Sequence, residues 1–135
     1  MSIEDIGRWP VSGQKARAKP PAFYHIPRSA MLRTIYGEEH PIAYAFYVSN
    51  DLIHMGELVV PPGGVGSRAS EVESHKGDEA LYVQEDPIVV YVPETSEAYE
   101  VRPGETMYLP EGTQHQYINY TNHVVKGIFA IAPNL

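Results

Sequence analysis

The stretch that decides the fold runs from Gly104 to Asn119 and reads GETMYLPEGTQHQYIN. A short run of alternating character at 106–109 leads into a Pro-Glu-Gly turn, and a second run rich in aromatic and aliphatic residues follows at 115–120. Short runs of period two that are separated by proline and glycine are typical of strands joined by tight turns. This stretch therefore predicts two short strands with a turn between them.

Four residues of the stretch have expected structural roles. Gly104 and Gly112 permit tight turns, because glycine adopts positive φ without steric cost. Pro110 stiffens the chain ahead of the strand that presents His115, and the side chain of Asn119 is suited to tie that strand to a loop by hydrogen bonds.

The same strand pattern continues through the chain from Pro41 onward. Runs rich in Val, Ile and Tyr are separated by Gly, Pro, Asn and Asp. Strands are predicted at Ile42 to Val48, Leu52 to Val60, Val72 to His75, Glu79 to Glu85, Ile88 to Val92, Ala98 to Arg102, Thr106 to Leu109, His115 to Tyr120 and Val124 to Ile131. No helix of three turns is evident after residue 40. Many short strands at near-regular spacing indicate a single all-β sandwich or barrel.

Four residues form a candidate metal site. The chain has no cysteine, so any metal must be bound by His, Asp or Glu. Glu73 and His75 share one face of a predicted strand at period two, and Glu79 returns on the next strand. His115 lies at a strand end beside a turn, and it joins the other three only through folding.

These residues resemble the two motifs of the cupin superfamily. The second motif, a glycine followed at fixed spacing by Pro-x-Gly, His and Asn, is matched in full by Gly104, Pro110, Gly112, His115 and Asn119. The first motif is matched in part, by the Pro-Pro-Gly-Gly turn at 61–64 and then by Glu73, His75 and Glu79. Glu73 stands where the family usually has a histidine.

The resemblance implies a jelly-roll barrel, the double-stranded β-helix of cupins, over residues 41–135. Residues 1–40 are then an extended, proline-rich arm. Six of the ten basic residues fall before Thr34, against only two acidic ones, so the arm is basic and the body is acidic. We expect the arm to lie across its own barrel or that of a neighbour, with an anionic partner as the alternative.

The resemblance also implies one divalent transition metal on His75, Glu79 and His115, with Glu73 as a fourth ligand. A mixed oxygen and nitrogen set suits Fe, Mn, Ni, Co or Zn, and the identity stays open. If Glu73 points away, the other three form a two-histidine, one-carboxylate triad and Glu73 is a general base. Without a metal, the carboxyl groups of Glu73 and Glu79 would crowd each other and one would hold a proton.

Several other residues are candidates for contact with a substrate. Three lie on predicted strands and are expected to face the interior: Tyr47, His54 and Met107. Such side chains are also common core residues. Arg68, in a loop at the predicted barrel mouth, could pair with a carboxylate or phosphate. Proton transfer is assigned to Glu73 or to Tyr117.

Composition limits the partners. The net charge of −7 opposes the phosphate neutralisation on which nucleic-acid binding depends. The apolar runs are too short to span a bilayer, and the first ten residues do not resemble a secretory signal. We therefore expect a cytoplasmic protein with a small-molecule substrate and neither nucleic acid nor membrane as a partner. A homodimer is expected, because pairing would cover exposed sheet edges.

Three functions fit this pattern. The first is a metal-dependent isomerase, epimerase or lyase that acts on a sugar derivative or a keto or hydroxy acid by metal-assisted enolisation. The second is a non-haem iron dioxygenase that uses the triad of His75, Glu79 and His115. The third is a small-molecule-binding protein without turnover. A cupin scaffold is compatible with all three.

Overall fold

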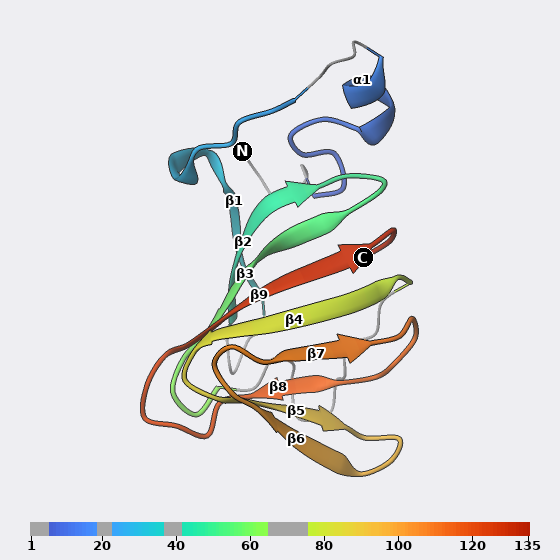
Figure 1. The fold of residues 1–135 in the computed structure, drawn as a ribbon. Helices are drawn as coiled ribbons and strands as arrows, with labels where there is room; N and C mark the ends of the chain where they lie inside the picture. The colour runs from blue at the N-terminus through green and yellow to red at the C-terminus, as the bar shows by residue number, and fades with distance from the viewer. Residues whose placement is uncertain (1–5, 19–22, 37–41, 65–75) are drawn as a thin grey trace.

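The computed structural model describes residues 6–18, 23–36, 42–64 and 76–135. Apart from the short helix α1 (Gly13–Arg17) and one 3-10 turn, η2 (Arg28–Ala30), its regular elements are strands (Figure 1). The strands are β1 (Leu32–Tyr36), β2 (Ile42–Ser49), β3 (His54–Val60), β4 (Asp78–Glu85), β5 (Ile88–Val92), β6 (Glu97–Val101), β7 (Thr106–Leu109), β8 (Gln116–Ile118) and β9 (Val125–Ala132).

These strands form two antiparallel sheets. The larger sheet has the order β1-β2-β3-β9-β4-β7, and the smaller one has the order β6-β5-β8. One apolar core joins them, because Leu58, Leu81 and Phe129 of the larger sheet cluster with Val90 and Tyr117 of the smaller sheet. The two sheets therefore pack face to face, as in a jelly roll.

Alternation along β9 shows how the sequence produces this packing. Val125, Gly127, Phe129 and Ile131 are buried, and the residues between them are partly exposed. Successive side chains of a strand point to opposite faces, so one face of β9 lines the core and the other lies outside. Each fully buried large apolar side chain contributes about 1.5–3 kcal/mol relative to an exposed one.

The predicted all-β fold is confirmed, with differences at the ends of elements. The strands predicted between residues 42 and 60 and between 79 and 131 are present, and β8 is shorter than expected. The strand predicted at 72–75 lies outside the described residues. Strand β1, within the predicted arm, is not indicated by the sequence pattern. It pairs with β2 over Leu32 to Tyr36 and forms an edge of the larger sheet.

The scaffold roles expected for Gly104, Gly112 and Asn119 are observed. Gly104 has a φ of 89° and Gly112 a φ of 79°, both in the left-handed region that favours glycine. The fully buried Asn119 donates from Nδ2 to the carbonyl oxygens of Val60 and Pro61 at 3.0 and 3.1 Å. The end of β8 is thereby tied to the end of β3.

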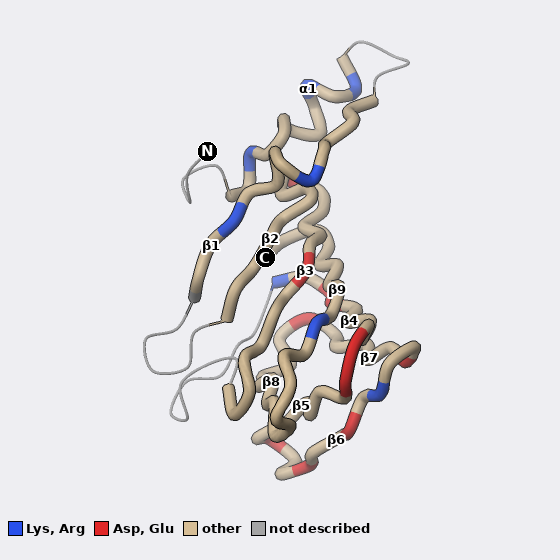
Figure 2. The backbone as a smooth tube through the Cα atoms, turned by 90° about the vertical axis from the view of Figure 1, so that its left-hand side faces the viewer, with Lys and Arg blue, Asp and Glu red and all other residues tan. Residues whose placement is uncertain are grey.

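Charge is unevenly distributed over the described part of the chain. Figure 2 shows Lys and Arg gathered around α1 and β1, whereas most Asp and Glu lie around β4, β6 and β7. The basic segment at residues 6–18 lies on this chain's own barrel, where Trp9 pairs with Ser49 and the Gly13 amide donates to Asp51. None of the described helices is long and apolar enough to cross a membrane.

Candidate functional site

His115 lies directly before β8 and is almost completely buried. Its Nδ1 atom is 2.8 Å from the carbonyl oxygen of Thr113. A carbonyl oxygen can only accept, so Nδ1 carries a proton and donates it. In the neutral ring the lone pair is consequently on Nε2. The backbone at Thr113 thus determines which nitrogen of His115 can bind a cation.

Glu79, on β4 of the other sheet, faces that nitrogen. Its Oε2 atom lies 3.2 Å from His115 Nε2, and the exposed fractions of the two side chains are 3% and 1%. Its other oxygen, Oε1, accepts a hydrogen bond of 2.5 Å from the hydroxyl group of Tyr117. Tyr117 is itself buried beside His115, with ring centroids 5.1 Å apart. The two sheets therefore bring three polar groups together in the core.

This pair has the chemistry of a cation site. Two electron-pair donors that face each other in a buried place need a proton or a metal ion between or beside them. Nitrogen and oxygen atoms that bind one ion at about 2.1 Å lie about 3.0 to 3.4 Å apart when they are neighbours in octahedral or tetrahedral geometry. The observed 3.2 Å fits two adjacent ligands. A ligating histidine that donates its other N–H to a backbone carbonyl is the usual arrangement.

Two more residues lie on the same inner face. His54 on β3 and Glu79 on β4 are both opposite Ile131 of β9, so the three side chains share one row. Two strand spacings put the backbones of His54 and Glu79 about 10 Å apart. Met107 on β7 is opposite Leu81 and packs against the apolar core. His54 is thus brought to the side of the sheet that carries Glu79, and Met107 has the packing role of a core residue.

The comparisons with known proteins agree with this architecture. No family model matches the chain, and no curated protein matches its sequence. Solved structures match with probability 1.00. The polyketide cyclase RemF from Streptomyces resistomycificus has a TM-score of 0.67 at 18% identity, covering 82% of this chain and 79% of that one. A sugar phosphate isomerase of the cupin superfamily from Silicibacter pomeroyi has a TM-score of 0.63 at 17% identity, covering 81% and 75%.

The chain has the cupin fold. A predicted oxalate decarboxylase from Thermotoga maritima is similar as well, with a TM-score of 0.66 at 15% identity over 82% of this chain and 99% of that one. The resemblance of the Gly104–Asn119 stretch to the second cupin motif is therefore matched by the arrangement of the strands. At these identities the likeness concerns the fold.

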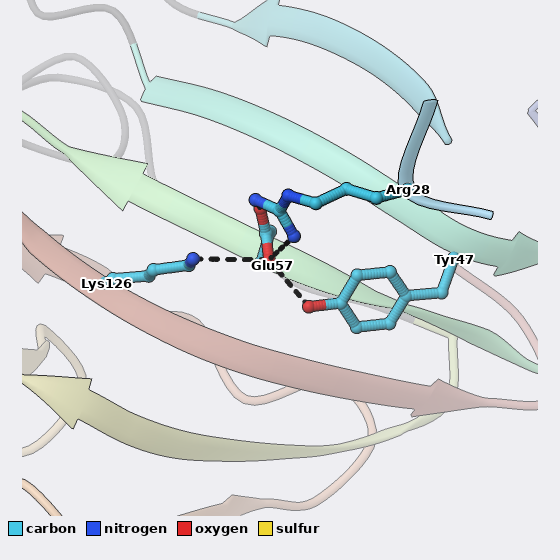
Figure 3. A network of polar contacts seen from close by, with 4 residues as sticks. All are labelled: Arg28, Tyr47, Glu57 and Lys126. Atoms are coloured by element: carbon cyan, nitrogen blue, oxygen red, sulfur yellow. Dashed lines mark hydrogen bonds and ion pairs between the residues drawn. The ribbon is translucent and has the colours of Figure 1, made fainter. Parts of the chain in front are cut away.

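Tyr47 is not brought to the site by this cupin barrel. Its hydroxyl group donates to Glu57 Oε2 at 2.7 Å, and Glu57 lies on the opposite face of β3 from the core residue Leu58 (Figure 3). Tyr47 directly follows the core residue Phe46, so alternation along β2 places it on the opposite face of the sheet. The position expected for Tyr47, facing the interior, is corrected to the outer face of the larger sheet.

Glu57 is the centre of a polar network on that outer face. Arg28 donates to both of its oxygens, at 2.7 and 3.4 Å, and Lys126 Nζ lies 3.6 Å away (Figure 3). Burial acts to raise the pKa of Glu57, but the hydrogen bonds from Arg28 and Tyr47 and the positive charges outweigh it, so the pKa is lowered. Burial and the contact with Glu57 raise the pKa of Tyr47 to about 12.

Three predicted site residues, Arg68, Glu73 and His75, lie outside the described residues. Within the described ranges, no group of three His, Asp or Glu side chains is arranged to hold a metal. Glu79 and His115 are accordingly the part of the predicted ligand set that the structure describes together.

Sequence reasoning missed two features of the barrel. The carbonyl group of Thr113 orients His115, but every residue has a carbonyl group, so the sequence carries no signal for it. Glu57 did have a signal, because a charged residue in the middle of the apolar run HMGELVV has to find partners.

Proposed function

We propose that the protein is a metal-dependent cupin enzyme that moves a proton on a small oxygenated substrate, as an isomerase, epimerase or lyase does. A sugar derivative or a keto or hydroxy acid is the proposed substrate class. The observation that carries this proposal is the buried 3.2 Å contact between Glu79 Oε2 and the lone-pair nitrogen of His115. It fits two neighbouring ligands of one ion, and it joins the two sheets.

Each residue of the proposed centre has a distinct task. Glu79 and His115 would bind the ion, and on the sequence pattern His75 completes the triad and Glu73 is the general base beside it. Tyr117 holds one oxygen of Glu79, so the other oxygen is turned toward His115. When bound, a divalent metal stabilises negative charge that develops on a substrate oxygen. Proton transfer is assigned to Glu73 rather than Tyr117, because the Tyr117 hydroxyl is buried and engaged with Glu79.

The names of the structural neighbours support an enzyme on this scaffold. One is called a polyketide cyclase, one a predicted oxalate decarboxylase and one a sugar phosphate isomerase. Each name denotes chemistry on an oxygen-rich small molecule. Their reactions differ from one another, so the substrate class proposed for this chain comes from the carboxylate-rich ligand set.

Metal analysis of His115→Ala tests the proposal. Freshly purified wild-type protein should contain about one equivalent of a divalent metal, and His115→Ala should contain almost none, because a lone-pair donor is lost from the centre. His123→Ala is the matched control, since His123 is exposed and lies in a turn. A His115→Ala variant that retains the wild-type metal content would contradict the proposal.

Deuterium exchange tests the chemistry. In D₂O, wild-type protein should exchange the proton next to the carbonyl group of at least one sugar phosphate or keto acid in a panel followed by NMR. His115→Ala should lose that exchange together with the metal. Full activity in the metal-free variant would rule out metal-assisted enolisation.

Two other functions are compatible with the contact between Glu79 and His115, and they predict different outcomes in the metal analysis and in the deuterium exchange. An iron dioxygenase that uses His75, Glu79 and His115 would consume oxygen with Fe(II) and a catechol or diketone substrate, without deuterium exchange. A binding protein without turnover would contain no metal, and Glu79 and His115 would then form an ion pair with a protonated imidazole.

A further inference from the structure

The outer face of the larger sheet has a hollow over β1, β2 and β3. Its volume is about 540 Å³, within the range of roughly 300–1,000 Å³ that is usual for small-molecule sites. Glu57 lines it, and Glu57 is on the opposite face of β3 from the core residue Leu58. The hollow therefore lies outside the barrel, apart from Glu79 and His115. Its other main lining residues are Arg33, Ile35, Ala43, Ala45 and Val59.

The register of the three strands explains why this face is hollow. Ala45 on β2 lies opposite Arg33 of β1 on one side and Glu57 of β3 on the other. Two positions away, Ala43 is flanked in the same way by an isoleucine and a valine. Side chains directly opposite each other on antiparallel strands are on the same face. The two short alanine side chains therefore form a low floor along β2, and the longer side chains of β1 and β3 form its walls.

The two ends of the hollow differ in chemistry. Ile35 and Val59 are the walls at one end, so that end is apolar. Arg33, at the other end, is exposed, and no carboxylate of the described residues is paired with it. A guanidinium group can bind a carboxylate through two parallel hydrogen bonds. The hollow thus offers an apolar surface beside a free cation.

The charges around Glu57 also favour an anion. Arg28 donates to both oxygens of Glu57, and Lys126 Nζ lies 3.6 Å from one of them (Figure 3). Tyr47 donates to the same carboxylate, so its oxygens already accept hydrogen bonds from the protein. With Arg33, three cations are gathered near one carboxylate, although the whole chain has a net charge of −7. A locally positive face on an acidic protein attracts a small anion.

We propose that the hollow binds a small organic carboxylate with an aromatic or aliphatic body. The carboxylate pairs with Arg33. The body lies on the alanine floor, between the walls formed by Ile35 and Val59. This site is independent of the proposed function, because it is on the opposite face of the sheet from Glu79.

Fluorescence titration of the full chain with 8-anilinonaphthalene-1-sulfonate tests the proposal, since the sulfonate group of this probe stands in for a carboxylate. We expect saturable binding with a Kd on the order of tens of micromolar, as is usual for a ligand of this size. N-phenyl-1-naphthylamine has the same rings without the anionic group. It should bind about tenfold more weakly, because it lacks the charged hydrogen bonds to Arg33.

Two variants locate the probe in the hollow. Arg33→Gln should raise the Kd of the sulfonate probe about tenfold and leave that of the neutral probe unchanged, because only the charge is removed. Ala43→Leu should weaken the binding of both probes, because the larger side chain fills the floor. Both positions are exposed, so neither change disturbs the core. Arg102→Gln, at an exposed arginine after β6 in the smaller sheet, is the control and should change neither affinity.

Several outcomes would overturn the inference. The absence of saturable binding, or equal affinity for the two probes, would do so with wild-type protein alone. Unchanged affinity of the sulfonate probe in Arg33→Gln or in Ala43→Leu would mean that it binds elsewhere, as in the barrel interior. Light scattering at the same protein concentrations covers the remaining case. Binding that appears only when the protein is diluted to a monomer would show that a second copy of the chain covers the hollow.

Discussion

Tyr117 holds Glu79 by a single hydroxyl group in the core. The variant Tyr117→Phe keeps the ring that packs beside His115 and removes only the donor. Partners that orient a ligand usually account for 10–100-fold in metal affinity, so we expect about that loss. Competition with a chelator measures it. Tyr99→Phe, an exposed tyrosine that contacts Glu97, is the control. Equal affinity in wild type and Tyr117→Phe would argue against Glu79 as a ligand.

Glu57 should matter for stability. It is buried, and its carboxylate accepts from Arg28 and Tyr47 and faces Lys126. Glu57→Gln removes the charge and should lower the free energy of unfolding by about 1–3 kcal/mol. Urea unfolding at neutral pH measures the change. The exposed Glu94→Gln should leave stability nearly unchanged. Equal stability of Glu57→Gln and wild type would show that the network contributes nothing.

The lowered pKa of Glu57 also sets the pH at which this contribution disappears. The folded state holds the carboxylate more strongly than the unfolded chain does. The contribution is therefore present above the ordinary carboxyl pKa and is lost as the pH falls through the lowered value. The difference in stability between wild type and Glu57→Gln should shrink when unfolding is measured in increasingly acidic buffers below about pH 4. A difference that grows in acid would contradict this sign.

For Tyr47 we expect stability to be lost at alkaline pH, whereas the contribution of Glu57 is lost in acid. Its pKa is raised to about 12, so the folded state favours the neutral phenol and loses stability as the pH rises through that value. Tyr47→Phe should remove this alkaline loss. Urea unfolding between about pH 10 and pH 12 compares the two proteins, and a parallel decline of both would exclude Tyr47 as the source.

At the level of elements, Asn119 links β8 to β3. Its Nδ2 atom donates to the carbonyl oxygens of Val60, Pro61 and His123. Asn119→Ala would leave buried carbonyl groups without this donor and should cost about 2–4 kcal/mol in unfolding free energy. Asn122→Ala, exposed in the following turn, is the matched control. A cost as small as that of the control would mean that the link is dispensable.

For the whole molecule we expect a homodimer. Strand β1 is an edge of the larger sheet, and Ile35 on it is 72% exposed. An apolar residue on an exposed edge favours pairing with another chain. Light scattering should give twice the mass of one chain, and Ile35→Lys should reduce it to one. Val124→Lys, at an exposed position before β9, should not change it. A wild-type monomer would exclude the dimer.

Local features of the sequence predicted much of the barrel. The run GETMYLPEGTQHQYIN contains its own turn residues and alternation, so it predicted β7, the turn and the location of His115. Strand β1 could not be predicted from local sequence features, because its five residues form a strand only through their pairing with β2. The face of Tyr47 could not be predicted from them either, because it depends on which of the two alternating faces of β2 packs against the other sheet, and Phe46 is the residue that lies in the core.

Strand periods, turns and the residue types of the site depend on short stretches of chain, where backbone sterics and alternating burial act within a few residues. The amino-acid sequence by itself therefore determines them. The 3.2 Å contact of Glu79 with His115 and the contact of Gly7 with Ser49 join residues that are 36 and 42 positions apart. Hydrogen bonds and ligand spacing depend on distances between such residues, so only packing of the two sheets and the N-terminal segment determines them.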